Sequence, residues 1–389
     1  MKQILVTLLC ICICGTTVYA QGVPKEQKTQ EITVSAESAI LMEASTGQII
    51  FEKNANKKLA PASVTKIMTL LLIFDAIHER KISLEDSVTV SEYAASMGGS
   101  QVFLEPGETQ VVDTMIKCIA VASANDACVA MAEYICGDEK EFVNKMNQRG
   151  KELGMVDTHF ENCNGLDANQ HLTTAHDIAL MSKELITKYP QYEAYSTIWM
   201  EDITHVTKKG TTKFGLTNTN KLVRQYEYAT GLKTGSTSKA KYCVSATAKK
   251  DDMELIAVIM AAPDYKIRFT DATTLLNYGF GKCKKYVDEE PYKLQHKPIA
   301  CGEKDSISIE CKDRFTYIDT KGQDTNAIIK KAVLKKRLIA PVKQGDVVGK
   351  LHYYLNNNEI GTALLLAKET VDKMDFQKAL IQILKVIML

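Results

Sequence analysis

The sequence has almost no net charge, and it lacks the common motifs of metal sites. Its 389 residues carry 48 Lys and Arg against 47 Asp and Glu, a formal net charge of +1. Nucleic-acid-binding proteins usually carry an excess of cations, so this balance gives no reason to expect that partner. The seven histidines form no H-E-x-x-H pattern, and no C-x-x-C pattern follows residue 20. The sequence therefore predicts no metal site and no cofactor.

An apolar run long enough to span a membrane is also missing from the C-terminal end. Lys373, Lys378 and Lys385 interrupt the last apolar segment, whereas a spanning helix needs about 20 mainly apolar residues. Helical spacing puts polar residues on one face and apolar residues on the other, namely Asp375, Lys378, Gln382 and Lys385 opposite Phe376, Leu380, Ile383, Leu384 and Ile387. We expect an amphipathic helix over residues 370–389 that lies on a membrane surface, with its lysines near lipid phosphates. The alternative is a helix packed on its own domain.

The first 20 residues have the pattern of a secretory signal. Met1 and Lys2 precede an apolar run from Ile4 to Cys14, and small residues follow up to Ala20. This pattern is typical of a segment that is cleaved during export. We expect cleavage after Ala20 and an exported protein at the outer face of the cytoplasmic membrane, attached through the C-terminal helix.

Cysteine is frequent, but the sequence does not predict a disulfide framework. Eleven cysteines occur, three of them in the first 20 residues. An exported chain with eight cysteines would normally suggest disulfides. However, Cys118, Cys128 and Cys136 lie in apolar helical sequence and Cys243 lies in an apolar strand, where cysteine usually serves as a small hydrophobic residue. We therefore expect these thiols to be unpaired packing residues.

Hydrophobic periodicity predicts an α+β fold. With 45% hydrophobic residues, a chain of this length can bury two cores. Paired apolar runs predict antiparallel strands near both ends of the first domain, and helical spacing dominates between them. These elements are a hairpin over 38–53, helices from 83 to about 145, a strand pair over 241–261 and a closing helix over 268–280.

From about residue 291 the pattern changes to short strands separated by turns. We therefore place a first domain, with an antiparallel sheet and an all-helical subdomain, at residues 30–288, and a small all-β domain at residues 291–368. The second domain carries a cluster of cations, namely Lys330, Lys331, Lys335, Lys336 and Arg337. This cluster indicates either contact with an anionic surface or a solvated strand face.

One stretch combines a nucleophile, a base and an anion site. Pro61 suits the first turn of a helix, and the apolar run from Ile67 onward can bury that helix. Ser63 and Lys66 share one helical face, so the amine can reach the hydroxyl, while free N–H groups at the helix start face the group that the serine attacks. Lys66 must then be neutral, which requires burial and a second cation to lower a pKa of about 10.4 by roughly 3–5 units.

Two further motifs suit the same chemistry. Ser123-Ala124-Asn125 interrupts a long apolar helical segment, so its polar side chains would be buried and in need of partners. Lys233-Thr234-Gly235 lies on a predicted strand, where Gly235 lets a substrate backbone approach the strand edge. Lys233 is a candidate for the second cation. The N–H groups of Ser63 and Ser236 are candidates for an oxyanion hole.

Each motif taken alone also has a simpler interpretation. The S-x-x-K pattern occurs twice more, starting at Ser236 and Ser238, so Ser63 could be only a helix N-cap. Ser123 or Asn125 could cap the helix that follows. The K-T-G motif could be an ordinary edge strand with a solvated lysine.

Together, the three motifs resemble a known family. S-x-N and K-T-G each occur once, in the order S-x-x-K, S-x-N, K-T-G and about 60 and 110 residues apart. This pattern resembles the penicillin-recognising serine transferases, and in particular the low-molecular-mass penicillin-binding proteins that act as serine-type D-Ala-D-Ala carboxypeptidases. The similarity runs from about residue 35 to the C-terminus. It is carried by Ala62–Thr69, Ser123–Cys128, Asn164–Asp167 and Leu275–Phe280.

The resemblance implies a β-lactamase/transpeptidase-like catalytic domain and a role for each motif residue. Ser63 would be acylated by a peptidoglycan stem peptide ending in D-Ala-D-Ala, Lys66 would be the base, and Ser123 would relay the proton to the leaving amine. Substrate binding would fall to Asn125, Lys233, Thr234, Gly235, Ser236 and Arg268. β-Lactam antibiotics would be covalent inhibitors, and the β-domain would set the catalytic part away from the membrane.

The sequence departs from the family pattern at two positions, and two rival functions remain. Ser236 stands where some relatives have histidine and Thr219 where some have arginine, which bears on substrate preference.

A serine β-lactamase is one rival function, but it needs a device for fast deacylation, such as a glutamate-held water, and we find no convincing counterpart. A non-catalytic cell-wall-binding protein is the other, and the intact Ser63 and Lys66 argue against it.

Overall fold

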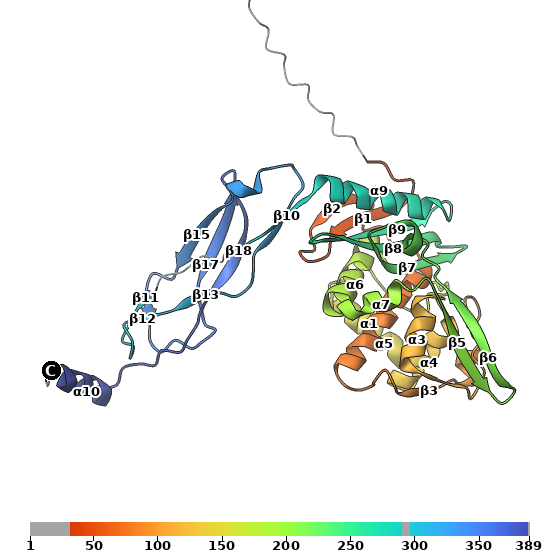
Figure 1. The fold of residues 1–389 in the computed structure, drawn as a ribbon, viewed down its shortest axis with the longest axis horizontal. Coiled ribbons are helices and arrows are strands. Elements are labelled where there is room, and N and C mark those ends of the chain that lie inside the picture. Colours follow the sequence, from red (N-terminus) through yellow and green to blue (C-terminus); the bar gives the residue numbers. More distant parts are fainter. Residues whose placement is uncertain (1–31, 290–295, 388–389) are drawn as a thin grey trace, which may run out of the picture. The chain divides into compact units, whose positions relative to one another are not determined.

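The computed structural model describes residues 32–289 and 296–387. The predicted signal at residues 1–20 and the cleavage site after Ala20 lie outside these residues. Within them, the chain forms the predicted α+β domain, followed by an all-β domain and a terminal helix (Figure 1).

A five-stranded antiparallel sheet forms the centre of the first domain, in the order β2-β1-β9-β8-β7. Its strands are β1 (Ser38–Glu43), β2 (Ile49–Lys53), β7 (Ala229–Thr237), β8 (Lys241–Lys250) and β9 (Met253–Ala262). The predicted hairpin and the predicted strand pair are confirmed. Strand β7, which carries the K-T-G motif, lies at one edge of the sheet, so none of the described strands pairs with one side of its backbone.

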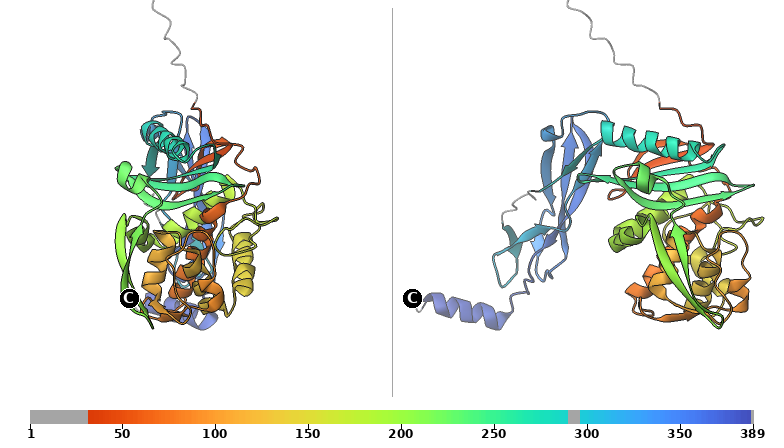
Figure 2. Two further views of the ribbon diagram at one scale, coloured as in Figure 1. Left: turned by 90° about the vertical axis from the view of Figure 1, so that its right-hand side faces the viewer. Right: turned by 45° about the vertical axis from the view of Figure 1, so that its right-hand side comes forward.

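Helices cover both faces of this sheet. α9 (Ile267–Lys282) lies on one face, and α6 (Ala175–Lys188) lies on the other (Figures 1 and 2). A side chain at Gly279 of α9 would come within 2.5 Å of Leu255 and 3.0 Å of Leu41, so this glycine lets the helix pack closely on β9 and β1. The predicted closing helix over 268–280 is confirmed.

The subdomain predicted to be all-helical lies between β2 and α6 in the sequence; it is mainly helical but also contains a short antiparallel pair of strands. It contains a 3-10 turn (Ala62–Thr65), α1 (Lys66–His78), β3 (Ser87–Thr89), α2 (Glu92–Ala95), β4 (Thr109–Val111), α3 (Val112–Ala120), α4 (Asn125–Cys136) and α5 (Glu139–Glu152). Apolar side chains of α1, α3, α4 and α6 form one continuous core. Because α1 enters this core at its first residue, Lys66 is buried from the outset.

A second hairpin flanks the subdomain (Figure 2). It is formed by β5 (Met200–Thr207) and β6 (Gly210–Thr217), and three short helices adjoin it: a 3-10 turn (Pro190–Tyr192), α7 (Glu193–Ser196) and α8 (Leu222–Gln225). His205 Nδ1 lies 2.8 Å from Glu108 Oε1, and both side chains are buried, so this pair ties the hairpin to the subdomain.

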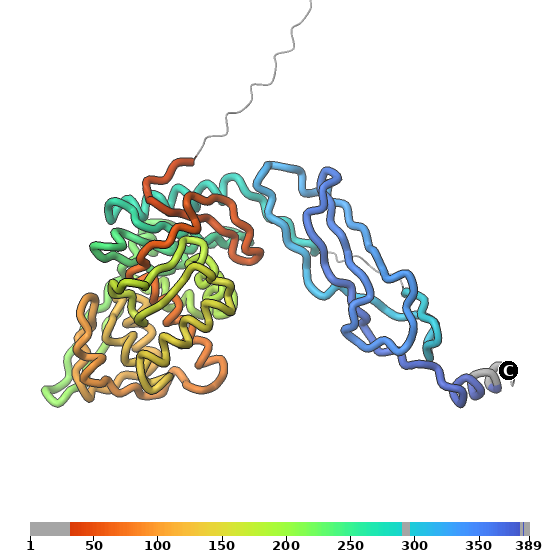
Figure 3. Tube along the Cα trace, turned by 180° about the vertical axis from the view of Figure 1, so that it is seen from behind, coloured from red at the N-terminus to blue at the C-terminus, as the bar shows by residue number. Residues whose placement is uncertain are grey.

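In its described residues, the second domain consists of strands and one short 3-10 turn. Its elements are β10 (Lys284–Val287), β11 (Lys297–Ala300), β12 (Ser306–Ile307), β13 (Ile309–Cys311), β14 (Thr316–Asp319), a 3-10 turn (Thr325–Ala327), β15 (Ile329–Leu334), β16 (Leu338–Ile339), β17 (Val347–Leu355) and β18 (Asn358–Ala367). The long strands β17 and β18 pair at its centre (Figure 3). β10 pairs with β14, so residues 284–287 hydrogen-bond with the β-domain although they lie within the predicted first domain.

The C-terminal helix α10 spans Phe376–Ile387. The exposed fractions of Phe376, Leu380 and Leu384 on this helix are 82%, 46% and 49%. The segment before the helix behaves differently, because Val371 is buried in the β-domain and bridges Val342. Among the described residues, no helix is long and apolar enough to cross a membrane.

The eight cysteines after residue 20 are all unpaired. Cys118, Cys128 and Cys243 are fully buried among apolar side chains, as the sequence predicts. Burial raises the pKa of Cys243 to about 11, which keeps this thiol protonated. These cysteines therefore serve as small packing residues.

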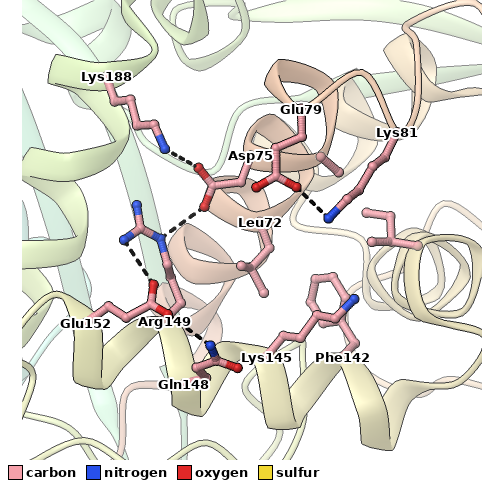
Figure 4. Close-up of a pocket in the computed structure, with 12 residues that line it drawn as sticks. Leu72, Asp75, Glu79, Lys81, Phe142, Lys145, Gln148, Arg149, Glu152 and Lys188 are labelled. Atoms are coloured by element: carbon pink, nitrogen blue, oxygen red, sulfur yellow. Dashed lines mark hydrogen bonds and ion pairs between the residues drawn. The ribbon is translucent and has the colours of Figure 1, made fainter.

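A cavity of about 390 Å³ lies between α1, α5 and α6, and ion pairs surround it (Figure 4). Asp75 is the hub, since it accepts from Arg149 Nε at 3.0 Å and from Lys188 Nζ at 2.7 Å, and it also accepts from the Tyr189 hydroxyl. Burial alone would raise the pKa of Asp75, but these hydrogen bonds and the charge of Arg149 outweigh burial and lower it. The cavity wall is thus a structural ion-pair network.

We predict that Asp75→Asn lowers the free energy of unfolding by about 1–3 kcal/mol, between the values for exposed and buried ion pairs. Glu79→Gln is the matched control, because its pair with Lys81 is exposed on both sides. Urea unfolding at neutral pH measures both. The pKa of Asp75 is lowered in the folded state, so the difference from wild type should shrink as the pH falls below the ordinary Asp value of about 3.9. Equal losses of unfolding free energy in the two variants would contradict the role of Asp75 as the hub of the ion-pair network.

Candidate active site

The Ser63 turn brings a hydroxyl and a buried amine together. Ser63 lies in the 3-10 turn and is half-buried, whereas Lys66 begins α1 and is fully buried. Lys66 Nζ lies 3.0 Å from Ser63 Oγ, in the arrangement that the three-residue spacing predicts. Ser63 makes no N-cap hydrogen bond for α1, since Thr65 occupies the cap position. The simpler interpretation as an N-cap serine is therefore wrong.

Two carbonyl oxygens hold the Lys66 amine from the other side. Nζ lies 2.6 Å from Asn125 Oδ1 and 2.6 Å from the backbone oxygen of Asn164. Burial lowers the pKa of Lys66, because the charged form loses its contact with water. A neutral amine has two N–H groups and one lone pair. With both N–H groups directed at these carbonyls, the lone pair faces the Ser63 hydroxyl and can accept its proton.

The S-x-N motif occupies the turn between α3 and α4. Ser123 adopts a left-handed backbone conformation with φ of 63°, and both Ser123 and Asn125 are buried. The N-cap of α4 is Ala124, which makes no side-chain cap, so the interpretation of Ser123 or Asn125 as a helix cap is wrong. Asn125 Nδ2 donates to the oxygen of Gly98 at 2.7 Å. That bond fixes the amide so that its oxygen points at Lys66.

Lys233 reaches the same pocket from the edge strand. Its side chain is 1% exposed, so the interpretation as a solvated edge-strand lysine is wrong. Its Nζ donates to Ser123 Oγ at 2.8 Å. Burial and then the like charge of Lys66 lower the pKa of Lys233 well below its ordinary value. The two buried amines are therefore coupled, and each disfavours a charge on the other.

Gly235 brings the edge strand into backbone contact with the nucleophile turn. A side chain at this position would come within 2.8 Å of the Ser63 nitrogen and 2.9 Å of the Pro61 oxygen. The sequence predicts that Gly235 lets a substrate backbone approach the strand, whereas in the structure the protein's own turn makes this close approach. Ser236, the next residue, is exposed. Its N–H remains a candidate for the oxyanion hole beside that of Ser63.

Arg268 on α9 lies against the K-T-G strand. Its Nη1 donates to the oxygens of Gly235 at 3.2 Å and Cys243 at 3.4 Å, and its guanidinium lies over the Phe269 ring. Arg268 is buried, and its Nε has no hydrogen-bond partner among the described residues.

Thr234 Oγ1 donates to Thr219 Oγ1 at 2.7 Å. Thr219, which stands where some relatives have arginine, therefore lies directly beside the K-T-G motif.

The rim loop over residues 98–104 is held by a buried carboxylate. Asp126 follows Asn125 and accepts from the N–H groups of Val102 at 3.2 Å and Leu104 at 3.1 Å. The Asn125 N–H in turn donates to the backbone oxygen of Ser100 at 2.7 Å. Because Asn125 and Asp126 both bond this loop, the loop that fixes the Asn125 amide is itself fixed by the same helix start.

The loop that contains Asn164 completes the pocket, and sequence reasoning missed its contribution. The sequence indicates Asn164–Asp167 only as part of the family resemblance, since a backbone carbonyl leaves no sequence signal of its role. Thr69 Oγ1 donates to the oxygen of Cys163 at 2.5 Å, which pins the loop to α1. Gly165 has a φ of 88°, and a side chain there would lie 1.9 Å from the oxygen of Ala62. A glycine at position 165 is the one sequence signal of this close backbone contact, because only glycine fits there.

Comparisons with known proteins cover both domains. A family model described as D-alanyl-D-alanine carboxypeptidase matches residues 25–264, and one described as penicillin-binding protein 5, C-terminal domain, matches residues 282–373.

Individual relatives match over nearly the whole chain. The D-alanyl-D-alanine carboxypeptidase DacF of Bacillus subtilis is 40% identical over 382 residues, which is 97% of this chain and 96% of that protein. DacC of Escherichia coli, also a D-alanyl-D-alanine carboxypeptidase, is 33% identical over 90% of this chain and 88% of that protein. Among solved structures, penicillin-binding protein 5 from Haemophilus influenzae has a TM-score of 0.78 at 28% identity, covering 88% of this chain and 99% of that one.

We predict that Gly165→Ala destabilises the fold by about 1–3 kcal/mol more than a matched glycine substitution, and displaces the Asn164 oxygen from Lys66. Gly154→Ala is the control, because Gly154 has a similar φ of 78° but open space around it. Chemical unfolding of both variants separates the clash from the backbone strain. An equal loss in both would show that the contact with Ala62 is unimportant.

Proposed function

Because the chain belongs to the D-alanyl-D-alanine carboxypeptidases of peptidase family S11, we propose that it removes the terminal D-Ala from peptidoglycan stem peptides through an ester on Ser63. The observation that carries this proposal is the buried Lys66 amine, held by two carbonyls with its lone pair toward the Ser63 hydroxyl. No step requires a cofactor, since serine and lysine supply the nucleophile and the base.

Acylation begins when Ser63 Oγ attacks the carbonyl carbon of the penultimate D-Ala. Lys66 takes the hydroxyl proton, and the carbonyl becomes a tetrahedral oxyanion that the N–H groups of Ser63 and Ser236 stabilise. The C–N bond then breaks. Ser123, whose Oγ accepts a hydrogen bond from Lys233, relays the proton that Lys66 took up to the leaving amine of D-Ala. Water hydrolyses the ester, which releases the shortened peptide and restores the Ser63 hydroxyl.

We expect two features to recognise the substrate: an edge strand that binds the peptide backbone, and basic side chains that bind the terminal carboxylate. The free edge of β7 can pair with an extended stem peptide, while Asn125 holds its amide. Lys233, Thr234 and Arg268 surround the place for the terminal carboxylate, and buried cations favour a single anion there. β-Lactams would acylate Ser63 by the same route, because their strained amide meets the same nucleophile.

The two rival functions fit less well. A freely diffusing β-lactamase has no need of the β-domain. This domain matches the family model of the C-terminal domain of penicillin-binding protein 5. A non-catalytic wall-binding protein would have no use for a lysine buried without an ionised partner. A lone buried lysine costs stability and is expected where chemistry requires it.

We also propose that the protein is exported and attached to the outer face of the cytoplasmic membrane through α10. The support is the signal-like pattern of residues 1–20 and the exposed apolar side chains of α10. On α10, Lys378 pairs with Glu303 of the β-domain, which orients the start of the helix. An amphipathic helix with one exposed apolar face binds the boundary between headgroups and acyl chains.

We predict that intact-mass measurement after penicillin treatment finds one adduct on the wild type and none on Ser63→Ala. Lys66→Ala should also lose acylation, because no base remains to take the serine proton. Ser238→Ala and Lys241→Ala, from another S-x-x-K pattern in the same chain, are matched controls that should form the adduct normally. An adduct on Ser63→Ala, or none on the wild type, would overturn the proposed mechanism.

We predict that removing residues 375–389 releases the protein from membrane vesicles and leaves carboxypeptidase activity unchanged. The cut leaves Val371 in place, because that residue belongs to the β-domain core. A milder test changes Leu380 and Leu384 to Gln, with Gln377→Ala as control, and follows flotation with anionic vesicles. Undiminished flotation of the shortened protein would rule out α10 as the anchor.

A further inference from the structure

A buried histidine contacts the residue next to Lys66. His171 is 2% exposed and lies in the loop before α6. Its Nε2 is 2.8 Å from Thr65 Oγ1, and its Nδ1 is 3.0 Å from the backbone nitrogen of Glu161. The Phe160 ring packs against it in a T-shaped arrangement, with ring centroids 5.8 Å apart. The sequence motifs did not single out this contact.

The hydrogen bonds define one tautomer of His171. The backbone N–H of Glu161 can only donate, so Nδ1 must accept and carries no hydrogen. The proton is therefore on Nε2, which donates to the Thr65 hydroxyl. Only the neutral ring can make both bonds, because a protonated ring would place an N–H opposite the N–H of Glu161.

His171 also closes the loop that carries Asn164. Residues 161 and 171 are the two ends of this loop, and a second bond joins the ends, from the Gln170 N–H to Glu161 Oε2 at 2.7 Å. At the tip, the oxygen of Asn164 lies 2.6 Å from Lys66 Nζ. One imidazole thus connects the base of the Asn164 loop to Thr65, which directly precedes Lys66 in the chain.

We propose that His171 is a positioning residue for acylation: as a neutral imidazole it fixes the Asn164 loop to the nucleophile turn and so keeps the lone pair of Lys66 directed at Ser63. This inference rests on the proposed function. His171 touches neither the substrate nor the reacting atoms. It acts through Thr65 on one side and through the Asn164 carbonyl on the other.

The arrangement should also limit the enzyme at low pH. The charged and titratable groups around the ring are Glu161, His159, Asp167 and Lys239, and burial has the largest effect. Burial lowers the pKa of His171 to about 4. The unfolded chain binds this proton near the ordinary value of about 6.5, so the contribution of His171 to stability falls as the pH drops from about 6.5 toward 4.

The test compares two variants with different hydrogen-bonding capacity. His171→Leu keeps most of the volume but makes neither bond, whereas His171→Gln keeps a donor and an acceptor and cannot titrate. Stopped-flow acylation by a chromogenic β-lactam gives the acylation rate and the non-covalent binding constant separately. His159→Gln is the matched control, since His159 lies in the same loop system but is exposed.

We predict that His171→Leu lowers the acylation rate about 10- to 100-fold and leaves non-covalent binding unchanged, because a displaced base costs rate rather than affinity. His171→Gln should restore most of the rate and should lose less activity than the wild type between pH 6 and 4. A folded His171→Leu protein with wild-type acylation, or a Gln variant no better than Leu, would overturn the inference. If the Leu variant does not fold, Thr65→Val breaks the same bond from the other side and should reduce the acylation rate.

Nitrogen NMR of the wild-type protein tests the tautomer without any substitution. We expect the Nε2–H form of His171 to persist to about pH 5. A ring that is protonated at Nδ1, or that titrates near 6.5, would contradict the inference. If wild-type Ser63 forms the adduct but the His171 ring is protonated at Nδ1 or titrates near 6.5, only the proposed role of His171 is contradicted. A wild type without an adduct defeats the proposed function itself.

Discussion

The structure depends on the burial of one amine, that of Lys66. In water this group would be charged and could not accept a proton from serine. Burial at the start of α1 lowers its pKa, and the carbonyl oxygens of Asn125 and Asn164 occupy its two N–H groups. A protonated amine would add a third N–H directed at Ser63, so the pocket sets both the protonation state and the direction of the base.

Three chain segments must converge for this burial to hold, and each is fixed by backbone contacts. The K-T-G strand approaches the nucleophile turn at Gly235, and the Asn164 loop approaches the same turn at Gly165. Asp126 fixes the rim loop through the N–H groups of Val102 and Leu104. Glycine therefore appears at two of the walls, where a side chain would push the segments apart.

Sequence reasoning located the motif residues because their side chains carry the chemistry and their types are restricted. Ser63, Lys66 and Lys233 could be identified in this way, and the hairpin, the edge strand and the closing helix followed from periodicity. The Asn164 carbonyl and His171 could not be identified, because a carbonyl is present at every residue and an isolated histidine has no spacing to compare. The pairing of β10 with β14 was missed for a related reason, since one short strand does not reveal its partner.

The electrostatics of the pocket connect its stability with its selectivity. Lys66, Lys233 and Arg268 are buried, and burial lowers the pKa of all three. The nearby carboxylate of Asp126 is engaged by backbone N–H groups rather than paired with these cations. A positive charge on any of these buried groups costs folding free energy while the pocket holds no anion. A peptide that ends in a free carboxylate relieves part of that cost on binding, whereas an internal peptide segment does not. The same burial that lowers the pKa of Lys66 therefore favours a chain end as the substrate, which is the preference of a carboxypeptidase.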